Sequence, residues 1–279
     1  MVTTIPCRLC GANSTFVMSQ RVLSSYEVGY FRCCKCGLLQ TEEPYWLDQA
    51  YSSTISALDT GAIFRNTHCT RLTLAIGRVL GIRRQIPCLD FGGGYGVFTR
   101  MMRDAGENYF WSDKYGPNNF ARGFEGSPKT AYRLVTAFEV FEHLANVHKE
   151  LTDLFSPGHD FVLVSTLLCE SVPTDWWYFV PESGQHVAFY SCRTMERIGM
   201  MFRYRPLTTC SFTLFIREGV RLALWRKLAI RWLLKYGLAA HVAGSLVGLW
   251  RMPLRSYMTD HRNLRRELNA LKAEGSQKP

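Results

Sequence analysis

The chain has 279 residues, of which 47% are hydrophobic and 20% are charged. This length accommodates one or two domains with a buried core, and the composition excludes a disordered chain. The formal net charge is +10. Residues 217–279 contain 13 Lys and Arg against 4 Asp and Glu, whereas residues 1–216 are nearly neutral. An anionic partner would therefore meet this C-terminal arm.

The first residues lack the features of a secretory signal, because neither a basic region nor an apolar run precedes Cys7. The longest stretch without Asp, Glu, Lys or Arg is residues 236–250, which is fifteen residues. A membrane-spanning helix needs about 20 apolar residues. We therefore expect a cytoplasmic protein, and the basic arm leaves open a peripheral contact at the inner face of the membrane.

Four regions follow one another along the chain. Their expected ranges are a zinc-binding segment at 1–45, a helical connector at 46–85, an α/β domain at 86–216 and a basic helical arm at 217–279. In the third region, short β-rich runs alternate with helical stretches, which is typical of a parallel sheet covered by helices. We predict its strands at residues 87–91, 109–112, 134–137 and 160–166.

Cysteines are concentrated near the N-terminus. Cys7 and Cys10 form a C-x2-C pair that is followed by glycine, and Cys33 and Cys36 form a second such pair. Two pairs at this spacing complete the tetrahedral thiolate shell of a structural Zn²⁺ ion. We predict a zinc site made of these four residues rather than a set of free buried thiols. Cys34 is then left outside the site.

A glycine-rich turn, CLDFGGGYGVF, follows the first predicted strand and opens a helix. Glycine lets the backbone approach a ligand closely and adopt positive φ. An acid ends the next strand, at the place where dinucleotide-type folds bind ribose hydroxyls. The residues that we expect to bind a cofactor are Asp90, Gly92, Gly94, Gly96 and Asp113.

The acid ahead of the glycines separates two classes of cofactor. NAD-binding turns begin with glycine, because the pyrophosphate needs the end of the helix. The Asp90 carboxylate would repel a pyrophosphate, but it suits S-adenosylmethionine, which carries an ammonium and a sulfonium group. The turn therefore favours a methyltransferase over a dehydrogenase.

Together these residues resemble the class I S-adenosylmethionine-dependent methyltransferases, and most of all the group with a four-cysteine zinc-binding N-terminal segment. That group includes sugar C-methyltransferases. The resemblance also rests on Val135–Leu144 (VTAFEVFEHL) and Gln185–Ser191 (QHVAFYS), and it covers about residues 5–205. It implies a Rossmann-like α/β fold with a small zinc ribbon, and a sugar or nucleotide-sugar as the methyl acceptor.

Methyl transfer to a hydroxyl or a carbon acid requires the removal of a proton, and imidazole titrates near neutrality. His143 follows Glu142 near the carboxyl edge of the predicted sheet, where open α/β folds bind ligands. His186 lies in a segment rich in aromatic residues. We predict these three residues as catalytic. A capping role for Glu142 and His143 and a packing role for His186 remain as alternatives.

A small molecule is therefore the expected partner. An RNA methyltransferase is the alternative function, since zinc ribbons and basic arms also suit RNA. The nearly neutral cofactor region lacks the basic stripe of an RNA-binding protein, however, which disfavours nucleic acid. In the arm, Lys227, Arg231 and Lys235 fall in one helical row. The arm either packs on the domain or lies on a membrane surface.

Overall fold

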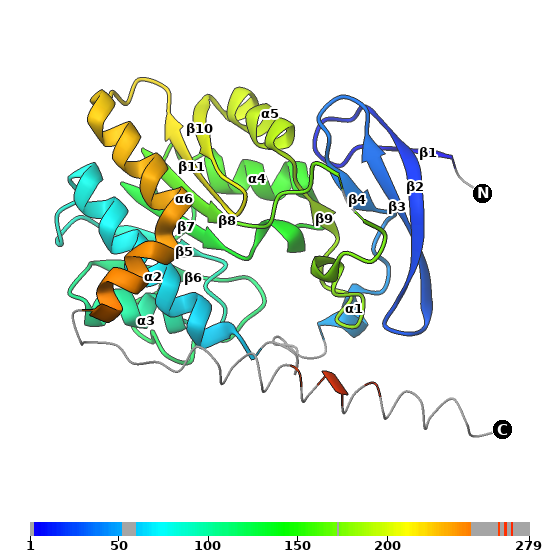
Figure 1. Ribbon diagram of the computed structural model, residues 1–279, viewed down its shortest axis with the longest axis horizontal. Helices are drawn as coiled ribbons and strands as arrows, with labels where there is room; N and C mark the ends of the chain where they lie inside the picture. The colour runs from blue at the N-terminus through cyan, green and yellow to red at the C-terminus, as the bar shows by residue number, and fades with distance from the viewer. Residues whose placement is uncertain are drawn as a thin grey trace.

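The computed structural model describes residues 3–51, 60–171 and 173–246, together with Arg262, Arg265, Arg266 and Asn269. This part of the chain contains a mostly parallel sheet with helices on both faces and a smaller antiparallel sheet beside it (Figure 1). The smaller sheet contains the N-terminal strands. The predicted α/β architecture with an N-terminal cysteine segment is confirmed.

The larger sheet has the strand order β10-β11-β8-β7-β5-β6. Its strands are β5 (Cys88–Phe91), β6 (Tyr109–Ser112), β7 (Leu134–Phe138), β8 (Phe161–Ser165), β10 (Tyr204–Thr208) and β11 (Phe212–Arg217). The first four are parallel and lie where the sequence predicted strands. The other two were not among the predicted strands, and β11 runs antiparallel to both of its neighbours.

Side chains alternate between the two faces of this sheet, and each face packs against its own helices. Leu134 belongs to the core formed with α2 (Ala62–Leu80), α3 (Val97–Asp104) and α6 (Leu224–Leu246). Its neighbour Val135 belongs to the core formed with α4 (Val147–Phe155) and α5 (Cys192–Phe202). The second core also includes Cys7, Cys33 and Cys36, so the cysteine segment packs against the sheet's own helical layer.

The smaller sheet has the order β1-β2-β3-β4-β9. Its strands are β1 (Thr4–Pro6), β2 (Asn13–Val22), β3 (Tyr26–Cys33), β4 (Leu39–Thr41) and β9 (Ala188–Phe189). The strand β9 pairs with β4 although it lies in the predicted range of the α/β domain. Trp46, Phe179 and Phe189 are buried in the core beside this sheet. The short helices are α1 (Leu47–Ala50), η1 (Phe141–His143) and η2 (Trp177–Phe179).

Helix α6 starts at Leu224, inside the range 217–279 that the sequence predicted as a basic helical arm. It lies beside α2 (Figure 1), and Ile230 and Leu234 are buried in the shared core. The helix departs from helical geometry at Tyr236. In the described part of the chain, no helix combines the length and the hydropathy that a bilayer crossing requires.

Candidate functional site

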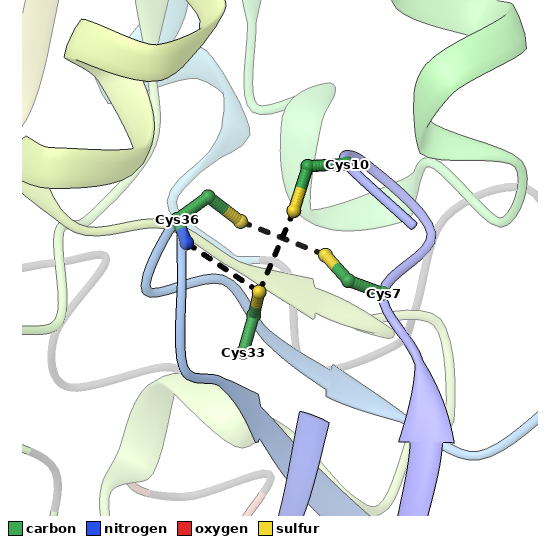
Figure 2. Close-up of side chains that lie close together, drawn as sticks. All are labelled: Cys7, Cys10, Cys33 and Cys36. Atoms are coloured by element: carbon green, nitrogen blue, oxygen red, sulfur yellow. Dashed lines mark hydrogen bonds between the residues drawn. The ribbon is translucent and has the colours of Figure 1, made fainter. Parts of the chain in front are cut away.

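Four cysteine thiols point toward one another between the N-terminal loop and the turn after β3 (Figure 2). The Sγ atoms of Cys7 and Cys36 are 3.5 Å apart, as are those of Cys10 and Cys33. All four sulfur atoms lie within 4.8 Å of one another. Tetrahedral zinc with Zn–S bonds of about 2.3 Å separates its sulfurs by roughly 3.8 Å, so these thiols fit the ion. Cys34 is exposed and lies outside this cluster.

Two glycine turns shape this cysteine cluster. Gly11 (φ 71°) and Gly37 (φ 79°) occupy the left-handed region directly after Cys10 and Cys36. The Gly37 N–H donates to the Cys33 carbonyl at 3.1 Å, and the Cys36 N–H donates to the Cys33 Sγ at 3.4 Å. A residue with a Cβ would be strained at either glycine. The C-x2-C-G spacing therefore fixes the direction of both pairs of thiols.

Arg8 connects the cysteine cluster to the segments that carry the predicted catalytic residues. Its guanidinium donates to the Ala145 carbonyl at 3.1 Å and also to the Val187 carbonyl. Its carbonyl accepts from the His148 N–H at 3.1 Å. Burial lowers the pKa of Arg8 to about 10, which leaves it charged at neutral pH. The cysteine segment thus holds the loops next to His143 and His186.

The glycine turn lies at the carboxyl end of β5, and its glycines differ in their surroundings. A Cβ on Gly92 would lie 2.5 Å from Val140 Cγ2, and one on Gly96 would lie 2.9 Å from Asn118 Oδ1. A Cβ on Gly94 would meet no atom within 4 Å. All three residues have positive φ. Gly92 and Gly96 therefore permit close packing, whereas the side of the turn at Gly94 is open.

Asp113 lies next to this turn and organises it. Its Oδ2 accepts from the Gly94 N–H at 2.8 Å. Its Oδ1 accepts from the Tyr115 and Gly116 N–H groups at 2.7 and 2.6 Å. A carboxylate has about four acceptor positions, so further hydrogen bonds remain available to it. The structure brings Asp113 and the glycine turn together, as the sequence predicted.

Asp90 is buried beneath the turn. It accepts from Thr99 Oγ1 at 2.9 Å and from Thr136 Oγ1 at 3.3 Å. A Cβ on Gly93 would lie 2.6 Å from its Oδ2. Burial raises the pKa of Asp90 to about 7, although both hydroxyl groups oppose this effect. Its carboxylate therefore supports the turn from the inner side, with its hydrogen bonds directed at α3 and β7.

Glu142, His143 and His186 form a second cluster at the same edge of the sheet. One potential ligand atom from each lies within 4.8 Å of those of the other two. The rings of His143 and His186 are 4.8 Å apart and nearly perpendicular. Glu142 is fully buried, whereas both histidines are half-buried. Two segments distant in sequence, η1 and the loop before β9, thus bring together the three residues predicted as catalytic.

Backbone carbonyls orient both histidines. The Nδ1 of His143 is 3.1 Å from the Gln185 carbonyl, and the Nδ1 of His186 is 2.7 Å from the Tyr178 carbonyl. A carbonyl accepts only, so each Nδ1 carries the proton and each Nε2 carries the lone pair. Burial, followed by the charge of His186, lowers the pKa of His143 to about 3. His143 is therefore neutral at physiological pH.

Glu139 and Tyr178 belong to this cluster but were not among the predicted site residues. The Tyr178 hydroxyl lies 2.7 Å from Glu142 Oε1 and 3.3 Å from Glu139 Oε2, and Ser165 Oγ donates to Glu139 Oε1 at 2.6 Å. Burial, followed by the charge of Glu142, raises the pKa of Glu139 to about 7. Glu139 also has a φ of 52°, which is uncommon for a non-glycine residue. The sequence signal that could have indicated Glu139 is its position three residues before Glu142.

Tyr51 links the two halves of the site, and no sequence signal pointed to it. Its ring stacks on Tyr115, next to Asp113, with a centroid distance of 5.3 Å. Its hydroxyl lies 3.3 Å from His143 Nδ1. The glycine turn and the Glu142–His143–His186 cluster are therefore neighbours along one edge of the larger sheet.

Most of the aromatic residues around His186 belong to the core and do not line an open pocket. Tyr178, Phe179, Phe189 and Tyr190 are all buried, whereas Trp177 is exposed. Phe179 and Phe189 pack edge to face at 5.0 Å, beside Tyr30 of the smaller sheet. This packing fixes the segment that carries His186.

The part of the chain that forms the larger sheet is similar to known methyltransferases. Residues 63–200 match the family model of a methyltransferase domain. No curated protein matches the chain in sequence. Solved structures with similarity include the mitomycin 7-O-methyltransferase MmcR, at 16% identity and a TM-score of 0.39, covering 52% of this chain and 53% of that one. The chain thus spans about half the length of that enzyme.

Two further solved structures are similar to this chain. One is the magnesium protoporphyrin IX methyltransferase of Synechocystis PCC 6803 with bound SAH, at 12% identity and a TM-score of 0.44, covering 63% of this chain and 98% of that one. The other is the O-methyltransferase NcsB1 from neocarzinostatin biosynthesis, at 12% identity and a TM-score of 0.42, covering 62% and 61%. The family match identifies residues 63–200 as a methyltransferase domain, and the strand order is that of the class I methyltransferase fold.

Proposed function

We propose that this enzyme transfers the methyl group of S-adenosylmethionine to a small molecule, and that the acceptor is a sugar or a nucleotide-sugar. The observation that carries the proposal is the position of the glycine turn and Asp113 beside the Glu142–His143–His186 cluster, with Tyr51 in contact with both sides. The resemblance of the cysteine segment to that of the sugar C-methyltransferases supports the acceptor class.

Gly94, on the open side of the turn, and Asp113 are the residues that would hold the cofactor, and the Asp113 carboxylate would accept hydrogen bonds from its ribose hydroxyls. Gly92 and Gly96 let Val140 and Asn118 approach the turn. Asp90 acts from beneath, where its carboxylate stabilises the positively charged methionine end of the cofactor and holds the turn through Thr99. S-adenosylmethionine supplies an electrophilic methyl group when it is bound here.

The acceptor lies against Glu142, His143 and His186. For a hydroxyl acceptor, an oxygen lone pair forms the new O–C bond, and the electrons of the broken S–C bond remain on sulfur. The products are the methylated acceptor, S-adenosylhomocysteine and one proton. Glu142, His143 and His186 are the residues that position the acceptor and assist the loss of that proton.

The four-cysteine cluster holds a structural zinc ion. Four thiolates fill a tetrahedral shell and leave no open coordination position for chemistry. The contacts of Arg8 with the Ala145 and Val187 carbonyls support an indirect role, in which the ion fixes the loops beside the catalytic histidines.

The outer face of α6 contacts an anionic membrane surface. Trp225, Leu228, Trp232 and Tyr236 are all exposed and recur at helical spacing. The exposed Arg231 and Lys235 flank this row. A basic helix with an aromatic row suits the membrane interface. The opposite face, with Ile230 and Leu234, packs on the domain. Under this proposal the protein binds the membrane peripherally.

Calorimetry with S-adenosylhomocysteine and with NAD tests the cofactor assignment. We expect binding of S-adenosylhomocysteine and none of NAD, and the reverse result would exclude the proposed function. Radiolabelled methyl transfer to a panel of sugars, nucleotide-sugars and short RNAs then tests the acceptor class. Preferential labelling of RNA would replace the small-molecule acceptor with the alternative.

A further inference from the structure

We propose that Glu142, His143 and His186, assisted by Glu139, hold a divalent transition-metal ion at the acceptor side of the site, separate from the four-cysteine cluster. The inference rests on the proposed function only for what the ion does to the acceptor. The binding of the ion itself depends on these side chains alone.

The arrangement of donor atoms supports a metal site. One ligand atom each from Glu142, His143 and His186 lies within 4.8 Å of the others, and they come from two segments. A central ion with bonds of about 2.0–2.2 Å would draw these atoms together by modest side-chain rotations. Two imidazoles and a carboxylate with open positions are a known ligand set for catalytic divalent ions.

The histidines are oriented as metal ligands require. Each Nδ1 proton is directed at a backbone carbonyl, from Gln185 for His143 and from Tyr178 for His186. Metal-binding histidines usually donate their other ring N–H to a carbonyl or a carboxylate, which fixes the tautomer and the ring orientation. In both rings the atom that we propose as the metal ligand is the other nitrogen, Nε2.

Glu142 provides an independent observation. It is fully buried, and its Oε1 accepts from the Tyr178 hydroxyl at 2.7 Å. Its Oε2 is also buried and has no hydrogen-bond partner. A buried carboxylate oxygen without a partner is costly, so it calls for a cation or a donor that binds there. A metal ion bound by Nε2 of the two histidines would satisfy this atom.

Glu139 adds a second carboxylate, which Ser165 and Tyr178 hold next to Glu142. The side chains that face the cluster from neighbouring elements are Tyr51 and Arg65, and the charge of Arg65 acts on both Glu139 and His143. Two neighbouring buried carboxyl groups suit a dication. The mixed nitrogen and oxygen donors favour Mn²⁺ to Zn²⁺ over Mg²⁺ or Ca²⁺, which prefer oxygen alone.

An ion with three or four protein ligands keeps open positions for the acceptor. A metal-bound hydroxyl loses its proton more readily, since the positive charge stabilises the oxyanion. In the methyl-transfer step, the histidines then position the ion, and the acceptor's proton leaves to solvent. An acceptor with two adjacent oxygen atoms, such as a vicinal diol of a sugar, would fill two open positions.

Titration with Mn²⁺ of enzyme that contains one zinc per chain, enough for the cysteine cluster alone, tests the site, and free Mn²⁺ is followed by electron paramagnetic resonance. Mn²⁺ is a suitable ion because thiolates disfavour it, so the cysteine cluster does not compete. We expect one bound Mn²⁺ per chain. Glu142→Gln and His186→Gln should each weaken binding at least about tenfold. Asp153→Asn, on the exposed side of α4, should leave it unchanged.

Two variants are used so that misfolding of one does not decide the test. Glu142→Gln removes a buried charge, whereas His186→Gln changes a half-buried ring. Circular dichroism and S-adenosylhomocysteine calorimetry on each variant establish that the fold and the cofactor site persist. Absence of Mn²⁺ binding by the unsubstituted enzyme at millimolar concentration, or binding by both variants as tight as that of the unsubstituted enzyme, would overturn the metal site. Failure of the proposed function gives a different result, namely loss of S-adenosylhomocysteine binding in the unsubstituted enzyme.

Discussion

Single side chains decide how the glycine turn is held. Asp113 accepts three backbone N–H groups, and Asp90 accepts two threonine hydroxyls from beneath. The sequence placed both acids correctly at the turn, because the ends of parallel strands meet at one edge. It did not reveal that the hydrogen bonds of Asp90 are directed into the domain, since this depends on Thr99 and Thr136 in two other elements.

Replacement of Asp113 by alanine should weaken S-adenosylhomocysteine binding by about 10–150-fold. Loss of hydrogen bonds to a charged acceptor costs roughly 1.5–3 kcal/mol, and the turn also loses the bond from Gly94. Isothermal titration calorimetry measures the change, with Asp153→Asn as the control. An unchanged dissociation constant would show that Asp113 does not contact the cofactor.

Asp90 should make the stability of the cofactor-free protein depend on pH. Burial raises its pKa from 3.8 to about 7, so the folded state retains a proton that the unfolded state loses. The stabilising contribution is fully present below pH 3.8 and is lost as the pH rises through 7. The free energy of unfolding therefore falls by up to about 1.4 kcal/mol per pH unit in this window.

Asp90→Asn should remove this dependence, because the amide does not titrate and can still accept from Thr99. Urea unfolding of zinc-loaded protein at several pH values between 5.5 and 7.5 provides the comparison. The variant should gain stability relative to the parent as the pH rises. Parallel curves for the two proteins would contradict the perturbed pKa of Asp90.

At the scale of elements, the strands that the sequence predicted are the buried parallel ones. Continuous apolar runs such as Phe161–Ser165 indicate them directly. The sequence did not indicate β10, because this strand contains an arginine and a proline, and it did not indicate β9, because this strand has only two residues. Tyr51 could not be predicted as a site residue, because its contacts with Tyr115 and His143 depend on three separate segments.

The cysteine segment should lose its metal and much of its stability when Cys10 is replaced by serine. A structural zinc ion contributes to the folding free energy, and three thiolates bind it less tightly than four. Elemental analysis should find about one zinc per chain in the parent and little in Cys10→Ser. The control is Cys34→Ser, because Cys34 is exposed and lies outside the cluster. A metal-free parent with a full thermal unfolding transition would exclude the zinc site.

At the scale of the whole molecule, two separate surfaces carry the proposed activities. The site lies along the carboxyl edge of the parallel strands, whereas the exposed aromatic row of α6 lies on the helix that packs beside α2. The sequence indicated that the arm was basic and helical. The sequence left packing on the domain and contact with a membrane as alternatives. The buried face and the exposed face of α6 are compatible with both at once.

The chain should co-sediment with anionic liposomes at low salt and remain in the supernatant at high salt. Each basic residue near the surface contributes about 1 kcal/mol, and this attraction is screened by ions. Replacement of Trp225 and Trp232 by serine should abolish sedimentation. The matched control is Trp177→Ser, which removes an equally exposed tryptophan elsewhere. Concentration-dependent dimerisation without liposome binding would instead assign this face to a second copy of the chain.

The pairing of β9 with β4 has a consequence for the order in which the molecule can assemble. Gln40 pairs with Ala188, so the cysteine segment leaves the ribosome long before its sheet can be completed. The strand that completes it follows His186 by two residues. Docking of the segment that carries His186 and closure of the N-terminal sheet are therefore one late event during synthesis. The cysteine segment is accordingly not a portable module: grafted onto another protein, it would arrive without its last strand.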